Sequence, residues 1–369
     1  MSNVSASAAP ERKGLALNFR QVINLLFGIA AAVFIYIVFN AIIGGKCDSR
    51  CVIATLNQAI RYAAPIALAA YCGLMCERAA IINIGIEGMM LTAAMVGYGV
   101  DVYAFTWLKA GGMDPAAAGE LSRWLALLLA VASSVLMALL HGIVSIRFKT
   151  DQIISGTVVN ILAVGITGYF YRQYLAQNIP PGPGTFQPFD IPLLAQIPVL
   201  GAIVFQGQKP IVYLMMVVTL LIHYVLFFTP WGLRTRAVGE NPRAADTLGI
   251  NVFRVRYINV LLGGVLAGFA GAWFTLEAVD VFNPQMTNGL GFIGLAAMIF
   301  GNWTPFGALA GALIFGLGNT ITTTVSIFRP DIPSQIPQML PYVLTILVLT
   351  GFVGRAIPPA ADGQPYEKQ

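Results

Sequence analysis

Residues 124–146, WLALLLAVASSVLMALLHGIVSI, form an apolar run without a single acidic, lysine or arginine side chain. Its length matches the roughly 20 residues that an α-helix needs to cross the hydrocarbon core of a bilayer. Similar runs recur along almost the whole chain, and only 10% of its residues are charged, whereas soluble domains carry about a quarter. The sequence therefore predicts an all-α integral membrane protein.

The apolar runs define about ten predicted spans. The first five are Val22 to Ile43, Leu56 to Met75, Ala80 to Val100, Trp124 to Ile146 and Ile153 to Tyr171. The second five are Ile211 to Phe228, Tyr257 to Val279, Leu290 to Gly301, Phe306 to Val325 and Gln335 to Val353. Five spans on either side of a long loop suggest an inverted 5+5 repeat around a central pathway.

Charge sets the orientation of these spans. Most of the 21 Lys and Arg residues fall in segments that the ten-span layout places in the cytoplasm, so both termini are predicted there. We expect a polar cytoplasmic N-terminus over residues 1–21, one transmembrane domain over 22–354 and a cytoplasmic tail over 355–369. Within the domain, the Pro- and Gly-rich stretch NIPPGPGTFQPFDIP belongs to an outer loop, 176–210. Residues 230–256 form a polar cytoplasmic loop.

Two spans have irregular sequences. Arg61 and Pro65 interrupt the second predicted span, and the eighth is too short to cross a bilayer by itself before the tight turn GNWTPFG, residues 301–307. Broken helices are tolerated at membrane depth only where they are buried in protein or line a cavity. These irregularities favour a transport pathway.

The polar loop contains the stretch GENPRAADTLGI, residues 239–250. Asn241 is a good N-cap, Pro242 suits the first helical position and Gly249 suits the residue after a helix end, so a short helix is predicted from Pro242 to Leu248. Two turns are too short for a helix that is stable alone in water. This helix must therefore pack against something.

One face of this short helix offers small side chains for close approach, with charged groups beside them. Ala244, Ala245 and Leu248 form that face, while Arg243 and Asp246 are available for charge-assisted contacts. This pattern suits a docking surface for another protein. The alternative is an inside loop whose arginines only anchor the topology, and the residues alone leave both interpretations open.

Several polar side chains fall inside the predicted spans. Asn83 and Glu87 lie one helical turn apart near the inner end of the third span. A carboxylate there must face a cavity or a partner, so the pair lines the pathway, or Glu87 caps or braces a bent helix against Arg61 or Arg78. Further pathway candidates at helical spacing are Thr157, Asn160, Asn319 and Thr323, although such side chains also bond helix carbonyls.

The same sequence argues against several other classes of protein. There is no catalytic triad, metal-ligand set or Gly-x-x-x-x-Gly-Lys-[Ser/Thr] phosphate loop. The net charge is +5, but the basic residues lie between apolar spans and form no basic patch interleaved with aromatics. No nucleic-acid partner is therefore expected. Cys47 and Cys51 fall in the first outer loop, where a disulfide is one possibility, whereas Cys72 and Cys76 suit helix packing.

Four stretches carry a resemblance to a known family. GENPRAADTLGI resembles the cytoplasmic coupling loop of ABC importer permeases that serve branched-chain amino acids, simple sugars and nucleosides. ERAAIINIGIEGMML (77–91) is similar to the signature that opens the family's third span, and DQIISGTVVNILAVGITGY (151–169) resembles its fifth. NGLGFIGLAAMIFGNWTPFGALAGALIFG (288–316) resembles its C-terminal portion. The likeness covers most of residues 56–354.

The resemblance implies a transport subunit that is not itself an enzyme and carries no cofactor. The short helix would sit in a groove of a separate ATPase subunit, which holds the MgATP. The implied coupling residues are Glu240, Asn241, Pro242, Arg243, Ala244, Ala245, Asp246 and Gly249. The other implied partners are a second permease, identical or homologous, an extracytoplasmic substrate-binding protein and membrane lipid. The expected location is the bacterial cytoplasmic (inner) membrane.

The substrate class also follows from the resemblance. ERAAIINIGIEGMML together with GENPRAADTLGI looks closest to the nucleoside branch of the family, so nucleosides moved by alternating access are expected. The alternative within the family is a monosaccharide of the ribose type. Outside it, an ion-coupled secondary transporter with Glu87 in its site, or a membrane scaffold, remains open.

Overall fold

The computed structural model describes residues 48–177, 179–333, 335–340, 343 and 356–368. The chain divides into two units, Met1–Ser49 and Arg50–Gln369, and the first lies almost wholly outside the described residues. The predicted span Val22 to Ile43 and most of Gln335 to Val353 also lie outside them. Apart from one isolated antiparallel bridge between Phe189 and Gln208, the described secondary structure is helical.

Seven described helical segments are long and apolar enough to cross a membrane. They are α2 (Ser49–Glu77), α3 (Ile86–Ala110), α4 (Pro115–Gly142), α5 (Gln152–Phe170), α6 (Pro210–Phe228), α9 (Val252–Trp273) and α11 (Pro305–Phe328). π-Helical turns extend three of them: Ile143–Arg147 after α4, Tyr171–Leu175 after α5 and Phe274–Ala278 after α9. The shorter helices are α7 (Pro230–Glu240), α8 (Pro242–Thr247), α10 (Leu290–Phe300) and α12 (Gln335–Gln338).

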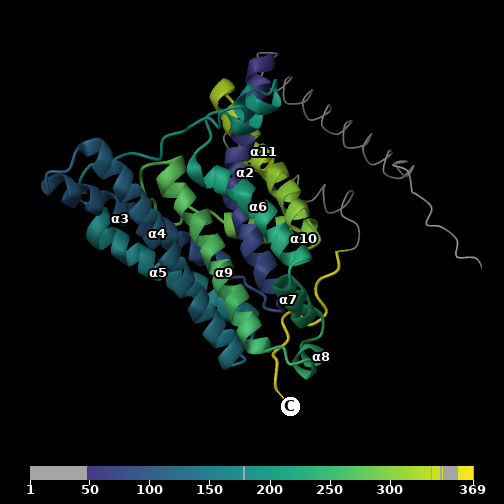
Figure 1. The fold of residues 1–369 in the computed structure, drawn as a ribbon. Coiled ribbons are helices and arrows are strands. Elements are labelled where there is room, and N and C mark those ends of the chain that lie inside the picture. The colour runs from purple at the N-terminus through teal and green to yellow at the C-terminus, as the bar shows by residue number, and fades with distance from the viewer. Residues whose placement is uncertain (1–47, 178, 334, 341–342, 344–355, 369) are drawn as a thin grey trace, which may run out of the picture. The chain divides into compact units, whose positions relative to one another are not determined.

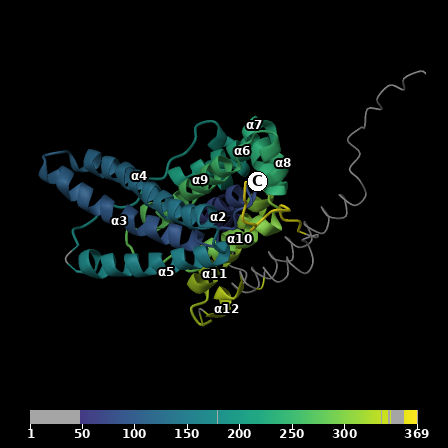
Figure 2. The ribbon, with the colours of Figure 1, turned by 90° about the horizontal axis from the view of Figure 1, so that it is seen from below.

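Small residues bring these helices together. The helices α3, α4 and α9 pack against one another, α5 lies along α3, and α10 lies beside α11 (Figures 1 and 2). In α9, a Cβ on Gly264 would lie 2.5 Å from the Cβ of Ala138, and one on Gly268 would lie 2.7 Å from the Cα of Val131. The Gly-x-x-x-Gly step of α9 therefore packs against α4 within the subunit.

The structure corrects the predicted interruption of the second span and the predicted start of the third. The helix α2 runs unbroken through Arg61 and Pro65. A proline is tolerated inside a membrane span because neighbouring helices can satisfy the backbone groups that it leaves unpaired. The third span begins at Ile86 and not at Ala80. Residues 78–85 form a turn in which Ala80 is left-handed, with φ of 64°, and the Asn83 side chain accepts from the backbone N–H of Gly85 at 3.1 Å. Asn83 therefore precedes the helix that carries Glu87.

The eighth predicted span is short, as the sequence indicated. It forms α10, of 11 residues, which packs along only part of α2. A Cβ on Gly294 would lie 2.6 Å from the Cβ of Ala69, and one on Gly73 would lie 2.9 Å from the side chain of Leu295. The N-terminus of α10 therefore lies level with the middle of α2, and the non-helical residues 279–289 reach this depth.

Candidate functional site

A cavity of about 430 Å³ lies where α10 begins. Its polar lining comes from three elements: Glu87 on α3, Asn160 on α5, and Gln285, Thr287 and Asn288 from the segment before α10. Two pathway candidates from the sequence, Glu87 and Asn160, thus meet at one place. The other four candidates, Asn83, Thr157, Asn319 and Thr323, do not line this cavity.

Glu87 caps the broken helix α10. One carboxylate oxygen accepts from the Thr287 hydroxyl at 2.6 Å and from the backbone N–H of Gly289 at 2.8 Å, and the other accepts from the backbone N–H of Gly291 at 2.7 Å. A negative charge at a helix N-terminus also interacts favourably with the helix dipole. Of the sequence alternatives, the geometry favours a helix cap, although the partner is α10 and neither Arg61 nor Arg78.

Asn160 fastens the start of α3 to α5. Its side-chain oxygen accepts from the backbone N–H of Gly88 at 2.8 Å, and its side-chain nitrogen donates to the backbone carbonyl of Ile84 at 3.0 Å. Gly88 allows this approach because a Cβ there would lie 2.9 Å from the Cα of Asn160. The side chain thus satisfies backbone groups that α3 leaves unpaired at its N-terminus.

Three of the four remaining pathway candidates, Asn83, Thr157 and Thr323, form side-chain hydrogen bonds within the fold. Asn83 is fully buried, and its side-chain nitrogen lies 3.6 Å and 3.5 Å from the sulfurs of Cys72 and Cys76. Both cysteines are free and buried, whereas Cys47 lies outside the described residues. The hydroxyls of Thr157 and Thr323 donate to helix carbonyls one turn earlier, at 2.9 Å and 3.0 Å. A pathway role for these residues stays a prediction.

The predicted short helix is present in the polar loop as α8. The Asn241 side chain accepts from the backbone N–H of Ala244 at 3.0 Å, Pro242 is the first helical residue and Gly249 is left-handed, with φ of 80°. The helix ends at Thr247, one residue earlier than predicted. The cap positions are thus confirmed, whereas the sequence missed the longer helix α7 that precedes α8.

The three residues of the predicted docking face of α8 differ in solvent exposure. Ala245 is 2% exposed and packs into a small core with Val238, Val252, Val255 and Tyr366. Leu248 is 81% exposed, and Ala244 is exposed as well. The prediction that all three share one docking face is therefore corrected: Ala245 anchors the helix to its own chain, while Leu248 remains free to meet a partner.

The C-terminal residues 356–368, termed the strap below, hold α7 and α8 in place (Figure 1). Tyr366 is 5% exposed, and its ring lies 5.4 Å from the Phe253 ring. The backbone N–H of Ala361 donates to the carbonyl of Gly239 at 2.9 Å. That of Ala360 donates to the Glu240 side chain at 3.2 Å.

Further contacts tie the strap to three other parts of the chain. The Arg256 guanidinium donates to the carbonyl of Gln364 at 3.1 Å, and the backbone N–H of Ile357 donates to the Asn302 side chain at 3.2 Å. Lys149 and Glu367 form an exposed ion pair at 2.6 Å. Sequence reasoning missed the strap because its mix of prolines, alanines and scattered polar residues carries no periodic signal.

The strap carries a carboxyl that makes its docking sensitive to pH. Burial raises the pKa of Asp362 to about 6, against the opposing effects of the Gly363 N–H, a hydrogen bond with the Glu77 carboxyl and the Arg256 guanidinium. Because docking raises this pKa, the contribution of Asp362 to the stability of the docked strap is fully present below the ordinary carboxyl range. That contribution is lost as the pH rises through about 6.

We expect the backbone amides of 356–368 to exchange hydrogen faster at pH 8 than at pH 5, after correction for intrinsic rates. Asp362→Asn should flatten this difference, and an unchanged profile in that variant would contradict the assignment.

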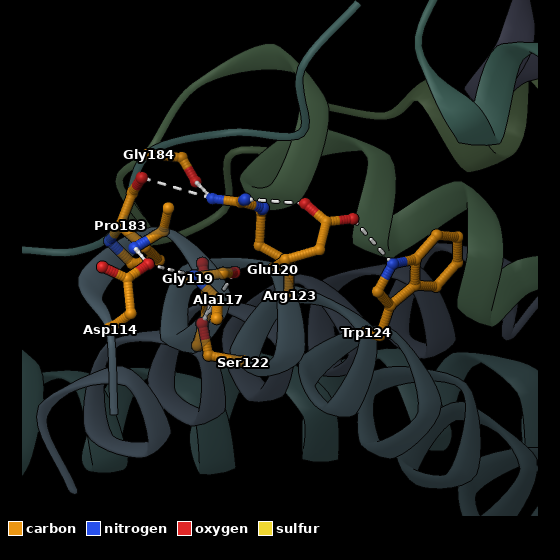
Figure 3. Close-up of polar contacts among 11 residues, drawn as sticks. Asp114, Ala117, Gly119, Glu120, Ser122, Arg123, Trp124, Pro183 and Gly184 are labelled. Atoms are coloured by element: carbon orange, nitrogen blue, oxygen red, sulfur yellow. Dashed lines mark hydrogen bonds and ion pairs between the residues drawn. The ribbon is translucent and has the colours of Figure 1, made fainter. Parts of the chain in front are cut away.

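At the opposite end of the helices, Arg123 anchors the long loop between α5 and α6. Its guanidinium donates to the carbonyls of Pro183 and Gly184 at 3.3 Å and 3.5 Å, and pairs with Glu120 at 2.9 Å (Figure 3). The same carboxylate accepts from the indole N–H of Trp124 at 2.9 Å. One side chain of α4 thus fixes the loop segment that carries the prolines.

Replacing this anchor should loosen the loop. Hydrogen bonds to a charged group contribute about 1.5 to 3 kcal/mol each, so Arg123→Ala should raise the rate of chymotrypsin cleavage after Phe189 by about tenfold. Arg172→Ala is the matched control, because Arg172 is exposed and, among the described residues, its side chain bonds only to the nearby Gly168 carbonyl of α5. Equal cleavage rates in the two variants would show that Arg123 does not hold the loop.

Membrane-length helices around a broken helix with a polar cavity, together with a capped helix on a polar loop, define a multi-pass membrane transport protein. The chain belongs to the family described as branched-chain amino acid transport system permease components, which it matches over residues 55–349. It is a multi-pass protein of the bacterial cytoplasmic (inner) membrane.

Several named relatives match most of the chain. The guanosine ABC transporter permease protein NupQ of Bacillus subtilis is 40% identical over 310 residues, 83% of this chain and 94% of the relative. The nucleoside ABC transporter permease protein NupC of Lactococcus lactis is 39% identical, with the same coverage. A putative glucose ABC transporter permease protein of Haloferax volcanii is 31% identical over 80% of this chain and 90% of its own. No solved structure matches the chain.

Proposed function

We propose that this protein is the permease subunit of an ABC importer for nucleosides, and that it moves solute by alternating access driven by a separate ATPase subunit. The observation that carries the proposal is the helix α8, which is capped by Asn241 and anchored by Ala245 while Leu248 stays exposed. The nucleoside class is supported by the two relatives named for guanosine and nucleosides.

The proposed topology has ten spans and both termini in the cytoplasm. Seven membrane-length helices and the short α10 belong to the described residues, and the first and last predicted spans lie outside them. An inverted 5+5 repeat is part of the same proposal. In this orientation α7, α8 and the strap face the cytoplasm, and the loop held by Arg123 faces outward.

The partners follow from this arrangement. An ATPase subunit, which binds the MgATP, docks at α8, and a substrate-binding protein docks at the outer loops. A second permease, identical or homologous, completes the pore, and this chain itself needs no cofactor. The solute pathway passes the cavity beside Glu87 and Asn160, and Asn83, Thr157, Asn319 and Thr323 remain candidates along it.

The ATPase contact is tested by charging the exposed tip of α8. Leu248→Glu should leave the subunit folded, since its side chain is 81% exposed, and should lower copurification of the ATPase by about tenfold through burial of an unpaired charge. The control is Leu233→Glu, which charges an equally apolar residue of 62% exposure on α7. Equal ATPase recovery for Leu248→Glu and the unaltered protein would remove α8 from the docking surface.

The proposed importer function is tested by identifying the energy source and the substrate of transport. The permease is reconstituted with its ATPase, second permease and binding protein, and uptake of labelled guanosine is measured with MgATP or an imposed ion gradient as the only drive. ATP-dependent uptake that unlabelled ribose does not inhibit is the expected result. Gradient-driven uptake would indicate a secondary transporter instead.

A monosaccharide importer is the second candidate, because the glucose-named relative is 31% identical over most of this chain. ATP-dependent uptake of labelled ribose that guanosine does not inhibit would favour this alternative. The protein would then still be the permease of an ABC importer, with a different substrate.

A further inference from the structure

Some polar side chains of the cavity beside α10 are hydrogen-bonded within the protein, and others are not. Glu87 accepts from Thr287, Gly289 and Gly291, and Asn160 is bonded at both ends of its amide. Within the part of the chain that the structure describes, the side-chain amides of Gln285 and Asn288 form no hydrogen bond. Two carboxamides are therefore available to a ligand.

The backbone holds these two residues in an uncommon conformation. Gln285 and Asn288 are left-handed, with φ of 60° and 45°, and Gly289 follows with φ of 80°. Side chains other than glycine rarely adopt this region, and such conformations persist where the surroundings impose them, often at ligand sites. Both side chains are exposed and both line the cavity.

The cavity also offers an aromatic surface. Phe292, on the first turn of α10, is 45% exposed and lines the cavity together with the apolar side chains of Leu91, Ile161 and Val164. Among the described residues, no other ring stacks on Phe292. The cavity thus combines a free aromatic ring, an apolar wall and two free amides.

We propose that this cavity holds the base of a nucleoside in transit, with the base stacked on Phe292 and its polar edge bonded by Gln285 and Asn288. The inference rests on the proposed function and names the residues that select the base. A carboxamide presents a donor and an acceptor in one plane, which matches the edge of a purine. Stacking on an aromatic side chain adds affinity for any base.

The size and charge of the cavity suit the same ligand. Its volume of about 430 Å³ lies in the range of pockets that enclose small organic molecules. Its one ionisable side chain, Glu87, already accepts hydrogen bonds from three protein donors, so most of its acceptor sites are occupied before a ligand binds. A purine offers a flat π-face to Phe292 and a donor–acceptor edge to the two amides, which is why the base and not the ribose is assigned here.

Photolabelling of the reconstituted importer locates the ligand directly. The complete complex is irradiated with 8-azidoguanosine, and the labelled peptides are identified by mass spectrometry. We expect the label within residues 285–292, with protection by excess guanosine and none by ribose. Labelling confined to other peptides, in a complex that imports guanosine with ATP, would overturn the inference while the proposed function stands.

Four variants test the residues by uptake at saturating loaded binding protein. Phe292→Leu, which keeps an apolar side chain, should lower guanosine uptake by about tenfold, and Phe292→Tyr should restore it. Gln285→Gly and Asn288→Gly remove one amide each and still suit a left-handed backbone. Each should lower guanosine uptake by several fold, and melting temperatures will show whether a variant has merely unfolded.

The matched controls lie away from the cavity lining. Phe228→Leu replaces an aromatic of 67% exposure on α6, and Asn283→Gly adds a glycine to the same segment at an exposed residue. Both should transport guanosine normally. Normal transport by folded Phe292→Leu would refute the assignment even if ATP-driven guanosine uptake is confirmed, whereas a complex without ATP-driven nucleoside uptake would refute the proposed function first.

Discussion

Replacing Glu87 with alanine is expected to unseat α10 and to abolish most transport. The carboxylate accepts three hydrogen bonds from the Thr287 hydroxyl and from the Gly289 and Gly291 backbone. Without it, two backbone N–H groups at membrane depth lose their acceptor, and each buried unpaired donor costs about 1 to 3 kcal/mol. Glu87→Ala should therefore lower the free energy of unfolding by about 3 kcal/mol, measured by thermal unfolding of the detergent-solubilised complex.

A conservative replacement distinguishes two roles of Glu87, the cap of α10 and a charge that acts in the solute pathway. Glu87→Gln keeps the size but turns an amide N–H₂ toward a backbone donor, so it should lose nearly as much stability as alanine. Glu120→Gln is the control, because that carboxylate is 54% exposed and surface pairs contribute at most about 1 kcal/mol. Full stability in Glu87→Gln together with lost transport would contradict the cap and indicate that the charge itself acts in the pathway.

Removing the Tyr366 ring is expected to uncouple ATP hydrolysis from transport. Replacement of a buried aromatic residue by alanine costs about 3 to 5 kcal/mol, and Tyr366 packs against the core residues that hold Ala245. With the strap undocked, α8 loses one of the surfaces on which it rests. Tyr366→Ala should therefore hydrolyse ATP at a near-normal rate while the amount of guanosine imported per ATP falls by about tenfold.

The strap also supplies its own controls. Tyr366→Phe keeps the ring contact with Phe253 at 5.4 Å and should transport normally. Glu367→Gln breaks the exposed ion pair with Lys149, which contributes at most about 1 kcal/mol, and should also be close to normal. Equal import per ATP in Tyr366→Ala and Tyr366→Phe would show that the strap is not needed for coupling.

Local rules account for what could be predicted from the sequence. The cap of α8 was predictable because its signals are local: the Asn241 side chain accepts from the backbone N–H of Ala244, and Gly249 adopts a left-handed backbone just after the helix. The shortness of α10 was predictable because Gly301 and Asn302 end the apolar run directly. Glu87 was predictable as a residue with a partner, since a carboxylate in a span requires one.

Long-range contacts decide what could not be predicted. The residues from Ala80 to Gly85 read as the start of a span, yet they fold as a turn held by α5. The Gln152 side chain accepts from the backbone N–H of Ile82 at 2.6 Å, and the Asn160 side chain donates to the Ile84 carbonyl at 3.0 Å. Ala245 faces inward because Tyr366 packs against it from the far end of the chain. Phe292 carried no signal, because an aromatic in an apolar run becomes available to a ligand only when the fold leaves its ring uncovered.

The strap also sets an order of events during biosynthesis. The ribosome completes the residues of α7 and α8 more than a hundred residues before Tyr366, so the nascent chain carries the coupling helix without the ring that packs against it. The core that contains Ala245 can close only after residues 356–368 have left the ribosome. A variant truncated before residue 356 would keep α7 and α8 but lack the Tyr366 ring from the core that holds Ala245. Under the proposed function, it should insert into the membrane yet bind the ATPase subunit less firmly.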